Sequence, residues 1–253
     1  MFAMPFLVFM LLMVVVPLCL LFFHAFAEDG AFTFAHFETV FTSDWLLPVL
    51  WQSIWIALVA CVIILVIAYP IAYGLAFGGF HRKTTILLLF TLPLWVNLLI
   101  RSTALRQLFV LMGADRGMFQ LLFAITINFL TIAILPIYIV LSNINKSHIE
   151  ASQDLGASPR RVFFKTIFPQ SIPGLIAAFV LVFAPVVSSF FFVQDFAVQG
   201  GTESLGELFG RLLRYRMFGL GAVISLVLLA FVSLVVFALN FFARKGNKRG
   251  GLW

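Results

Sequence analysis

The passage SHIEASQDLGASPRRVFFKTIFPQSIPG, residues 147–174, is the one long polar, helix-forming passage in an otherwise apolar chain. Ser147 and Glu150 have the spacing of a capping box, in which the Ser hydroxyl caps the backbone N–H three residues on while the Glu reaches back. This spacing predicts a short helix that begins at His148. Gly156 can adopt the left-handed conformation that closes a helix, which gives this helix about two turns.

A second short helix is predicted to follow at a new angle. Ser158 supplies an N-cap, and Pro159 stands at the first helical position, where its missing N–H costs nothing. We expect Pro169 and Pro173 to stop this helix. Its apolar side carries Phe163, Phe164, Ile167 and Phe168. Two short helices joined at a bend, with one aromatic stripe, are typical of a docking surface.

The composition identifies the chain as an integral membrane protein. Of its 253 residues, 63% are hydrophobic and 10% are charged, with a mean hydropathy of +1.13. Soluble globular proteins carry about 25% charged residues. The net charge is +6, but the basic residues are dispersed among apolar runs instead of gathered on a soluble face. We therefore do not expect nucleic-acid binding.

Six apolar segments predict an all-α, polytopic membrane protein with six transmembrane helices, in a single transmembrane domain that spans residues 1–253. The expected spans are residues 2–27, 48–77, 84–110, 118–141, 175–193 and 217–242. Pro93 interrupts the third span. Residues 28–45 and 194–216 are expected to be loops, and the polar segment occupies residues 142–174. Gly74 and Gly78 in the second span admit two interpretations. They either let another helix approach closely, or they simply end the helix.

The first span admits two interpretations. Ala25-Phe26-Ala27 before Glu28 resembles a signal-peptidase site, so cleavage has to be considered. The apolar run is longer than a typical signal-peptide core, and no Lys or Arg precedes it. We therefore expect a retained membrane helix.

Charge asymmetry predicts the orientation. The side with the turn at residues 81–83, the polar segment and the C-terminal tail holds ten of the 16 Lys and Arg residues. The positive-inside rule places that side, together with both termini, in the cytoplasm. The docking surface would then face ATP-containing solvent.

Motifs for catalysis and metal binding are missing from the sequence. A P-loop requires G-x-x-x-x-G-K-[ST], because backbone N–H groups cradle the phosphates and a Lys reaches them, and no such run occurs. The four His residues are scattered, and Cys19 and Cys61 each lie within apolar runs, where a thiol is a small hydrophobic side chain. We expect no enzyme activity, no metal site and no bound cofactor.

Glu150-Ala151-Ser152, followed by Gly156 and by Ile167-Phe168-Pro169, resembles the E-A-A-x-x-x-G…I-x-L-P signature of the cytoplasmic loop in permease subunits of bacterial ABC importers. Two positions depart from this signature, with Ser152 in place of Ala and Phe168 in place of Leu. The resemblance implies the type I ABC importer permease fold in a bacterial inner membrane.

Within that superfamily the chain is similar to the spermidine/putrescine permease family. The matching residues are 69–73 (YPIAY), 92–101 (LPLWVNLLIR), Leu135-Pro136, and Asp195 before Gly200-Gly201. The resemblance implies polyamine import. The alternatives are import of another small organic solute by the same machinery, an ion-driven secondary carrier, or a membrane-anchored scaffold.

The resemblance also implies partners and a coupling role. The partners would be a homologous second permease subunit, a dimeric ATP-binding subunit that uses ATP and Mg²⁺, and a periplasmic substrate-binding protein. The polar segment would act as a lever between the ATPase and the membrane helices. Glu150 and Gly156 would maintain its bend, and Phe163, Phe164 and Ile167 would fill a groove of the ATPase. The remaining members of the expected coupling loop are Ala151, Ala157, Pro159 and Pro169.

A polycation requires carboxylates and aromatic faces along its route. Asp195 is the first candidate for a carboxylate that contacts the substrate. The alternative is that Asp195 is an interfacial residue, either in solvent or paired with Arg211 or Arg214. The other candidates for the substrate path are Tyr69, Tyr73, Trp95, Asn97, Phe191 and Phe192. With 32 Phe in the chain, most aromatic side chains are expected to face lipid or neighbouring helices. Arg101 is expected to be structural, since a cation would repel a polyamine.

Overall fold

The computed structural model describes residues 3–28, 31–79, 82–188, 196 and 205–250. Within these ranges the chain is helical apart from a two-stranded hairpin of β1 (Ala27–Glu28) and β2 (Ala31–Phe32). The helices are α1 (Ala3–Phe26), α2 (Ala35–Thr42), α3 (Leu46–Phe77), α4 (Lys83–Trp95), α5 (Leu98–Leu111), α6 (Met118–Ser142), α7 (Lys146–Asp154), α8 (Pro159–Val162), the π turn η1 (Phe163–Ile167), α9 (Phe168–Val187), α11 (Leu205–Arg214) and α12 (Phe218–Gly250).

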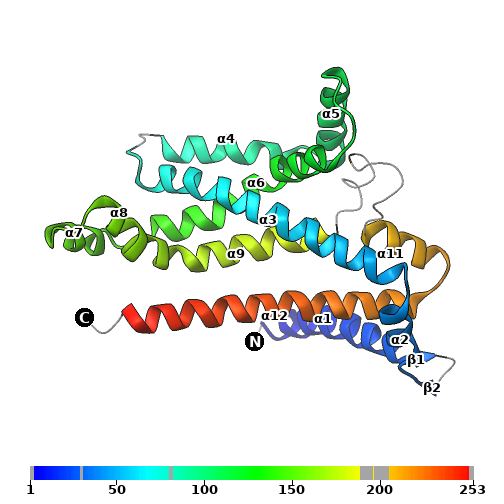
Figure 1. Ribbon diagram of the computed structural model, residues 1–253. Helices are drawn as coiled ribbons and strands as arrows, with labels where there is room; N and C mark the ends of the chain where they lie inside the picture. The colour runs from blue at the N-terminus through cyan, green and yellow to red at the C-terminus, as the bar shows by residue number, and fades with distance from the viewer. Residues whose placement is uncertain (1–2, 29–30, 80–81, 189–195, 197–204, 251–253) are drawn as a thin grey trace.

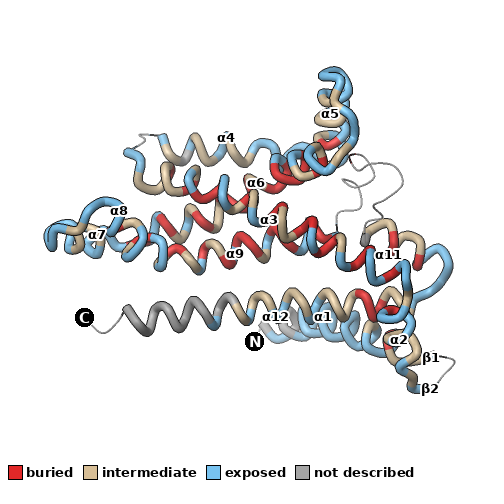
Figure 2. The backbone as a smooth tube through the Cα atoms, viewed as in Figure 1, coloured by how far each residue is buried: buried red, intermediate tan, exposed pale blue. Residues whose placement is uncertain are grey.

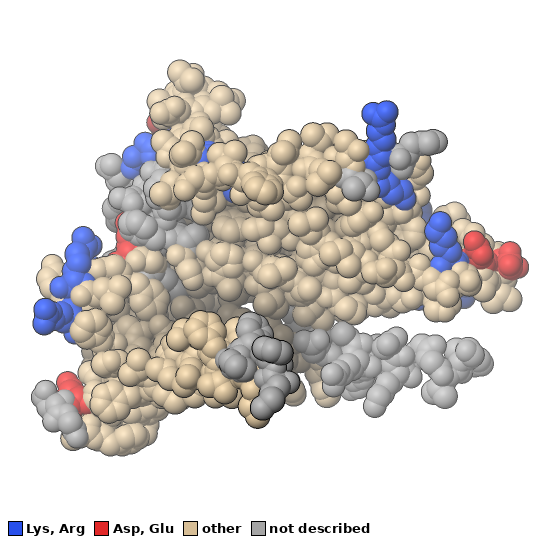
Figure 3. All heavy atoms as spheres, turned by 180° about the vertical axis from the view of Figure 1, so that it is seen from behind, with Lys and Arg blue, Asp and Glu red and all other residues tan. Residues whose placement is uncertain are grey.

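Five helical stretches are long and apolar enough to cross a membrane, and α4 with α5 forms a sixth if the bent pair counts as one span. The five are Val8–Phe26, Leu46–Phe77, Met118–Ser142, Pro159–Val187 and Phe218–Ala238. On the face shown in Figure 3, charged side chains lie toward the ends of the molecule, and a broad uncharged region separates them. These features confirm an all-α, multi-span membrane fold.

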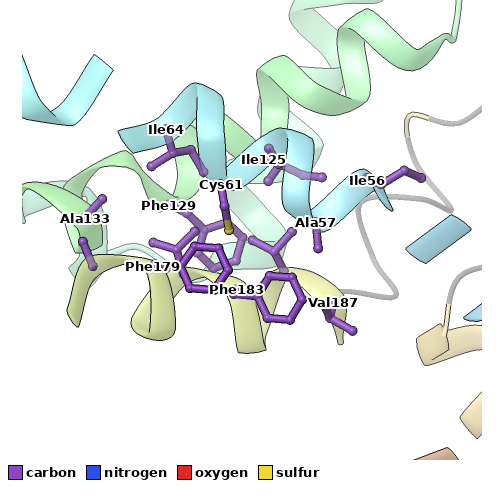
Figure 4. Packing of buried hydrophobic residues seen from close by; sticks show 14 of the residues in the cluster. Ile56, Ala57, Cys61, Ile64, Ile125, Phe129, Ala133, Phe179, Phe183 and Val187 are labelled. Carbon is purple, nitrogen blue, oxygen red and sulfur yellow. The ribbon is translucent and has the colours of Figure 1, made fainter. Parts of the chain in front are cut away.

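The core lies between α3, α6 and α9, which run side by side through the molecule (Figure 1). Buried residues concentrate on these three helices (Figure 2). Figure 4 shows Cys61 of α3 among Phe129 of α6 and Phe179 and Phe183 of α9. The rings of Phe179 and Phe183 stack with centroids 5.2 Å apart. Cys61 is fully buried in this core, whereas Cys19 on α1 is exposed.

A second layer consists of α12, which packs against α9, and α1, which lies along α12 (Figure 1). Only 6% of the apolar stretch of α1 is buried within this chain. Its side chains therefore face lipid or other membrane subunits, which explains why the stretch is apolar on all sides.

Two expected loops contain secondary structure. Residues 28–45 form the hairpin and α2, and residues 205–214 form α11. In α11, Leu208 and Leu212 are one helical turn apart and are both buried, which is the spacing that fixes one face of a helix.

The predicted stop at Pro169 is wrong, because the helix that begins at Pro159 continues to Val187. The π turn η1 makes this possible. In it the N–H of Phe168 donates to the carbonyl of Phe163, five residues back, so the regular bonding pattern is already shifted where Pro169 enters. Pro169 then stands in the first turn of α9, where a missing N–H is tolerated. The fifth span accordingly begins before residue 175.

A close glycine-mediated contact between two helix backbones lies at Gly174 and not at Gly74. A Cβ placed on Gly74 would meet no atom within 4 Å, and Gly78 simply caps α3. A Cβ on Gly174 would lie 3.0 Å from Cβ of Val140 and 3.1 Å from the carbonyl oxygen of Pro136. The backbones of α9 and α6 therefore approach one another at Gly174.

Replacing Gly174 by Val should force α9 away from α6, because backbone atoms of α6 cannot move aside as a flexible side chain would. We expect a loss of about 1–3 kcal/mol of stability, typical of overpacking. The measurement is the thermal unfolding midpoint of the purified protein in detergent. The matched control is Gly74→Val, which has open space at its Cβ, and an equal loss in both variants would contradict this account.

Candidate functional site

The polar segment begins at a cap different from the one predicted. The side chain of Asn145 accepts a hydrogen bond from the N–H of Ser147 at 3.1 Å, so α7 starts at Lys146. The capping box between Ser147 and Glu150 is therefore wrong in register. Asn145 is a good N-cap residue in its own right, and its position directly before α7 was the signal in the sequence.

Gly156 closes α7 in the predicted conformation. Its φ of +77° is left-handed, and the N–H of Ala157 donates to the carbonyl of Ser152 at 3.1 Å. The N–H of Gly156 donates to the carbonyl of Gln153 at 2.8 Å, which completes a Schellman motif. The chain then turns, and α8 begins at Pro159 as predicted, although the Ser158 side chain makes no capping bond.

Side-chain hydrogen bonds fasten α7 to the helix that follows. The hydroxyls of Ser152 and Thr166 are 3.1 Å apart, and Nδ1 of His148 lies 3.5 Å from Oε1 of Gln170. Ser152 is one of the two positions at which the sequence departs from the signature, and its hydroxyl contacts Thr166 and the carbonyl of His148. The two short helices are thereby held as one unit.

The aromatic stripe is divided between the inside and the outside of the molecule. Ile167 is only 4% exposed, and the ring of Phe163 packs against Tyr69 and Tyr73 of α3. Ile167 is buried and is therefore not available to fill a partner's groove, whereas Phe163 is half-buried and its expected role stays a prediction. Phe164 is 65% exposed, and Leu155, which the sequence analysis did not select, is 89% exposed. Of the remaining predicted residues, Glu150, Ala151, Pro159 and Pro169 are exposed and Ala157 is half-buried.

Tyr69 connects the polar segment to α3. Its hydroxyl lies 3.0 Å from the hydroxyl of Ser171, and its ring contacts Phe163 and Phe168. Tyr69 is 8% exposed, so it is part of this packed junction. Tyr73 packs on Phe163 and Phe77 in the same cluster. The expectation that these tyrosines line a substrate path is therefore not supported.

The break between α4 and α5 is a built elbow with an angle of 91°. The side chain of Asn97 caps α5 by accepting from the N–H of Leu99 at 2.8 Å. Arg101 donates to the carbonyl of Pro93 at 2.6 Å and to both the side chain and the carbonyl of Asn128 on α6. Asn128 is 1% exposed. These bonds satisfy polar groups that are costly at membrane depth when they have no partner, and they agree with the structural role expected for Arg101.

The candidates for the substrate path are not brought together by the described residues. Trp95, which is 87% exposed, and Asn97 lie at the elbow, whereas the two tyrosines lie beside the polar segment. Asp195, Phe191 and Phe192 lie outside the described residues. Among the residues that the structure describes, no group of three or more His, Cys, Asp and Glu could hold a metal ion.

Residues 61–249 match the family described as "Binding-protein-dependent transport system inner membrane component". The chain belongs to this family. The match covers α3 from Cys61 onward together with the elbow, the polar segment and nearly all of α12.

The sequence is similar to two permeases of known systems. It is 29% identical over 181 residues to the spermidine/putrescine transport system permease protein PotB of Haemophilus influenzae, covering 62% of each chain. It is 27% identical over 176 residues to PotB of Escherichia coli, covering 60% of this chain and 62% of that one. The chain thus spans less than two thirds of the length of these relatives.

Solved structures show the same fold. A bacterial ABC transporter involved in the import of the acidic polysaccharide alginate superposes with a TM-score of 0.67 at 15% identity, covering 96% of this chain and 94% of that chain. The MetNI methionine ABC transporter in an inward-facing conformation gives a TM-score of 0.56 at 18% identity, covering 81% and 95%. The expected type I importer permease fold is confirmed.

Replacing Arg101 by Met should destabilise the elbow, because Asn128 is buried and would lose its charged donor. Hydrogen bonds to charged groups contribute about 1.5–3 kcal/mol, and we expect a loss of that size in detergent unfolding. Arg116→Met, at an exposed arginine between α5 and α6, is the control and should change little. Equal stability of both variants would show that Arg101 does not hold the elbow.

Proposed function

We propose that this chain is the permease subunit of an ATP-driven, binding-protein-dependent importer, and that the polar segment is its coupling element. The observation that carries this proposal is the pair of exposed apolar side chains, Leu155 and Phe164, on helices that are fastened to one another. Exposed apolar side chains on an otherwise polar surface mark an interaction site. Family membership supports the same function.

The continuity of α8, η1 and α9 explains how force would reach the membrane. A displacement of α8 by a partner passes along one uninterrupted helix into α9, which packs on α6 at Gly174. The Tyr69–Ser171 contact connects the same region to α3. A movement at the docking surface therefore changes the packing of all three core helices together.

The energy source lies in a partner, because the chain carries no P-loop. We propose that a dimeric ATP-binding subunit, with its ATP and Mg²⁺, docks on Leu155 and Phe164. A homologous second permease subunit and a periplasmic substrate-binding protein complete the importer. Uptake that fails on ATP depletion and survives collapse of the ion gradient would separate this function from that of an ion-driven carrier.

The orientation is part of the proposal. Figure 1 shows α7, α8, the start of α4 and the end of α12 at one end of the molecule. That end carries ten of the 16 basic residues, so the positive-inside rule places it in the cytoplasm. Helix α11, the hairpin and the tip of α5 then face the periplasm.

Polyamines are the proposed substrates, on the basis of the similarity to spermidine/putrescine permeases. Asp195 remains the candidate carboxylate for a polycation. Phe191 and Phe192 are the aromatic candidates beside it in the sequence, and Trp95 and Asn97 remain candidates at the elbow. Tyr69 and Tyr73 are withdrawn from this role because they belong to the junction with α3.

The double variant Leu155→Ala, Phe164→Ala should lose ATPase docking, since both side chains are exposed and contribute apolar area to the contact. Truncation at an interface hot spot costs about 2 kcal/mol or more, so co-purification of the ATPase should fall by at least about tenfold. The control is Phe119→Ala, a 70% exposed phenylalanine at the opposite end of α6. Undiminished ATPase recovery with the double variant would refute the docking surface.

Asp195→Asn tests the substrate assignment independently of docking. If Asp195 contacts the polycation, removing its charge should raise the apparent KM for polyamine uptake by about five- to tenfold, while the assembled complex is recovered normally. Uptake by vesicles with the complete importer is the measurement. An unchanged KM would exclude Asp195 from the substrate path, and polyamine specificity would then have to be sought in the binding protein.

A further inference from the structure

An apolar cavity lies between α1, α11 and α12, remote from the polar segment. Its volume is about 230 Å³. Leu212 and Ala222 are buried at its base, and Leu20, Leu213 and Met217 are half-exposed at its rim. The cavity is smaller than the sites of drug-sized ligands, which are about 300–1,000 Å³, and its open rim suits part of a flexible chain.

The surroundings of the cavity indicate what occupies it. Helices α1 and α12 present uncharged sequence along its sides, with no Lys, Arg, Asp or Glu between residues 3 and 26 or between residues 217 and 243. Both helices are membrane spans. The cavity therefore opens toward the bilayer, where hydrocarbon chains are the abundant apolar molecules.

Two arginines lie in the turn between two residues that line the cavity. Leu213 and Met217 line it, and the turn between them carries Arg214 and Arg216, both exposed. Backbone bonds fix this turn, with the N–H of Arg216 donating to Leu213 at 3.1 Å and that of Met217 donating to Leu212 at 2.8 Å. The turn joins α11 to α12 at the end of a membrane span, which is the depth of lipid headgroups.

We propose that this cavity binds an anionic phospholipid. One acyl chain lies in the cavity between α1, α11 and α12, and the phosphate headgroup contacts Arg214 and Arg216. Apolar area holds the chain, and the arginines select lipids with a negative headgroup over zwitterionic ones. The site is at the end of the molecule opposite to the polar segment, so it is distinct from the docking surface (Figure 1).

Two variants separate the chain site from the headgroup site. A Cβ on Gly221 would lie 3.9 Å from the ring of Phe209 and 4.0 Å from Leu212, so Gly221→Leu fills the cavity without a backbone clash. Gly210→Leu on α11 is its control, because no atom lies near that Cβ and Gly210 does not line the cavity. Arg216→Gly removes a guanidinium and retains the turn, because φ is +55° at this position and glycine adopts it without strain.

The probes are phosphatidylglycerol and phosphatidylethanolamine, each with a photoreactive diazirine on one acyl chain. The permease is purified with its partner subunits into nanodiscs that contain one probe, irradiated, and digested for mass spectrometry. We expect phosphatidylglycerol to label peptides from α11 and the start of α12. Arg216→Gly should lower this labelling by about fivefold, the effect of one basic residue near an anionic membrane surface, and leave phosphatidylethanolamine unchanged. Gly221→Leu should abolish labelling by both probes, and Gly210→Leu should not.

Three results would overturn the proposal. Labelling that persists in Gly221→Leu would place the lipid elsewhere, and equal labelling by the two probes in the unmodified protein would remove the headgroup contact. Absence of lipid labelling in α11 and at the start of α12 would show that no acyl chain occupies the cavity. None of these readouts depends on substrate or on ATP hydrolysis, so they do not test the transport function.

Discussion

The contact between Gly174 and the Pro136–Val140 turn of α6 is the constraint on which the arrangement of the core depends. Only a residue without a side chain allows the two backbones to approach so closely. This contact fixes where α9 begins its passage along α6, and therefore where the polar segment leaves the bundle. The position of the polar segment at the end of the molecule is thus set by the packing of α9 on α6 in the core.

The π turn η1 complements this contact. A strictly regular helix across Phe163–Pro169 would place the proline ring against a carbonyl of the preceding turn. The shifted bonding of η1 avoids this clash and leaves α8 joined to α9 by helix instead of by a loop. Because Ser152 and Thr166 also connect α7 to η1, the exposed side chains of Leu155 and Phe164 lie on a body that moves with α9.

Polar groups at membrane depth are used where the chain must bend. Arg101 bonds Pro93 and Asn128, and Asn97 caps α5, so the elbow is held by side chains that satisfy one another. The exposed apolar surfaces of α1 and α12, by contrast, have no packing partner among the described residues of this chain over much of their length. They remain unpaired in this chain because bilayer, and partners within it, supply the other side of the contact.

The sequence by itself determined the membrane class, the existence of the long spans, the closure of α7 at Gly156 and the restart at Pro159. These follow from composition and from local backbone preferences, which act over a few residues. Tertiary structure alone decided that Ile167 and Phe163 face inward while Phe164 and Leu155 face outward, and that Tyr69 and Tyr73 support a junction. It also decided that Pro169 does not end a helix. An aromatic stripe in the sequence shows only that the side chains are apolar. Which of them are buried depends on neighbours such as α3, which lies about a hundred residues away along the chain.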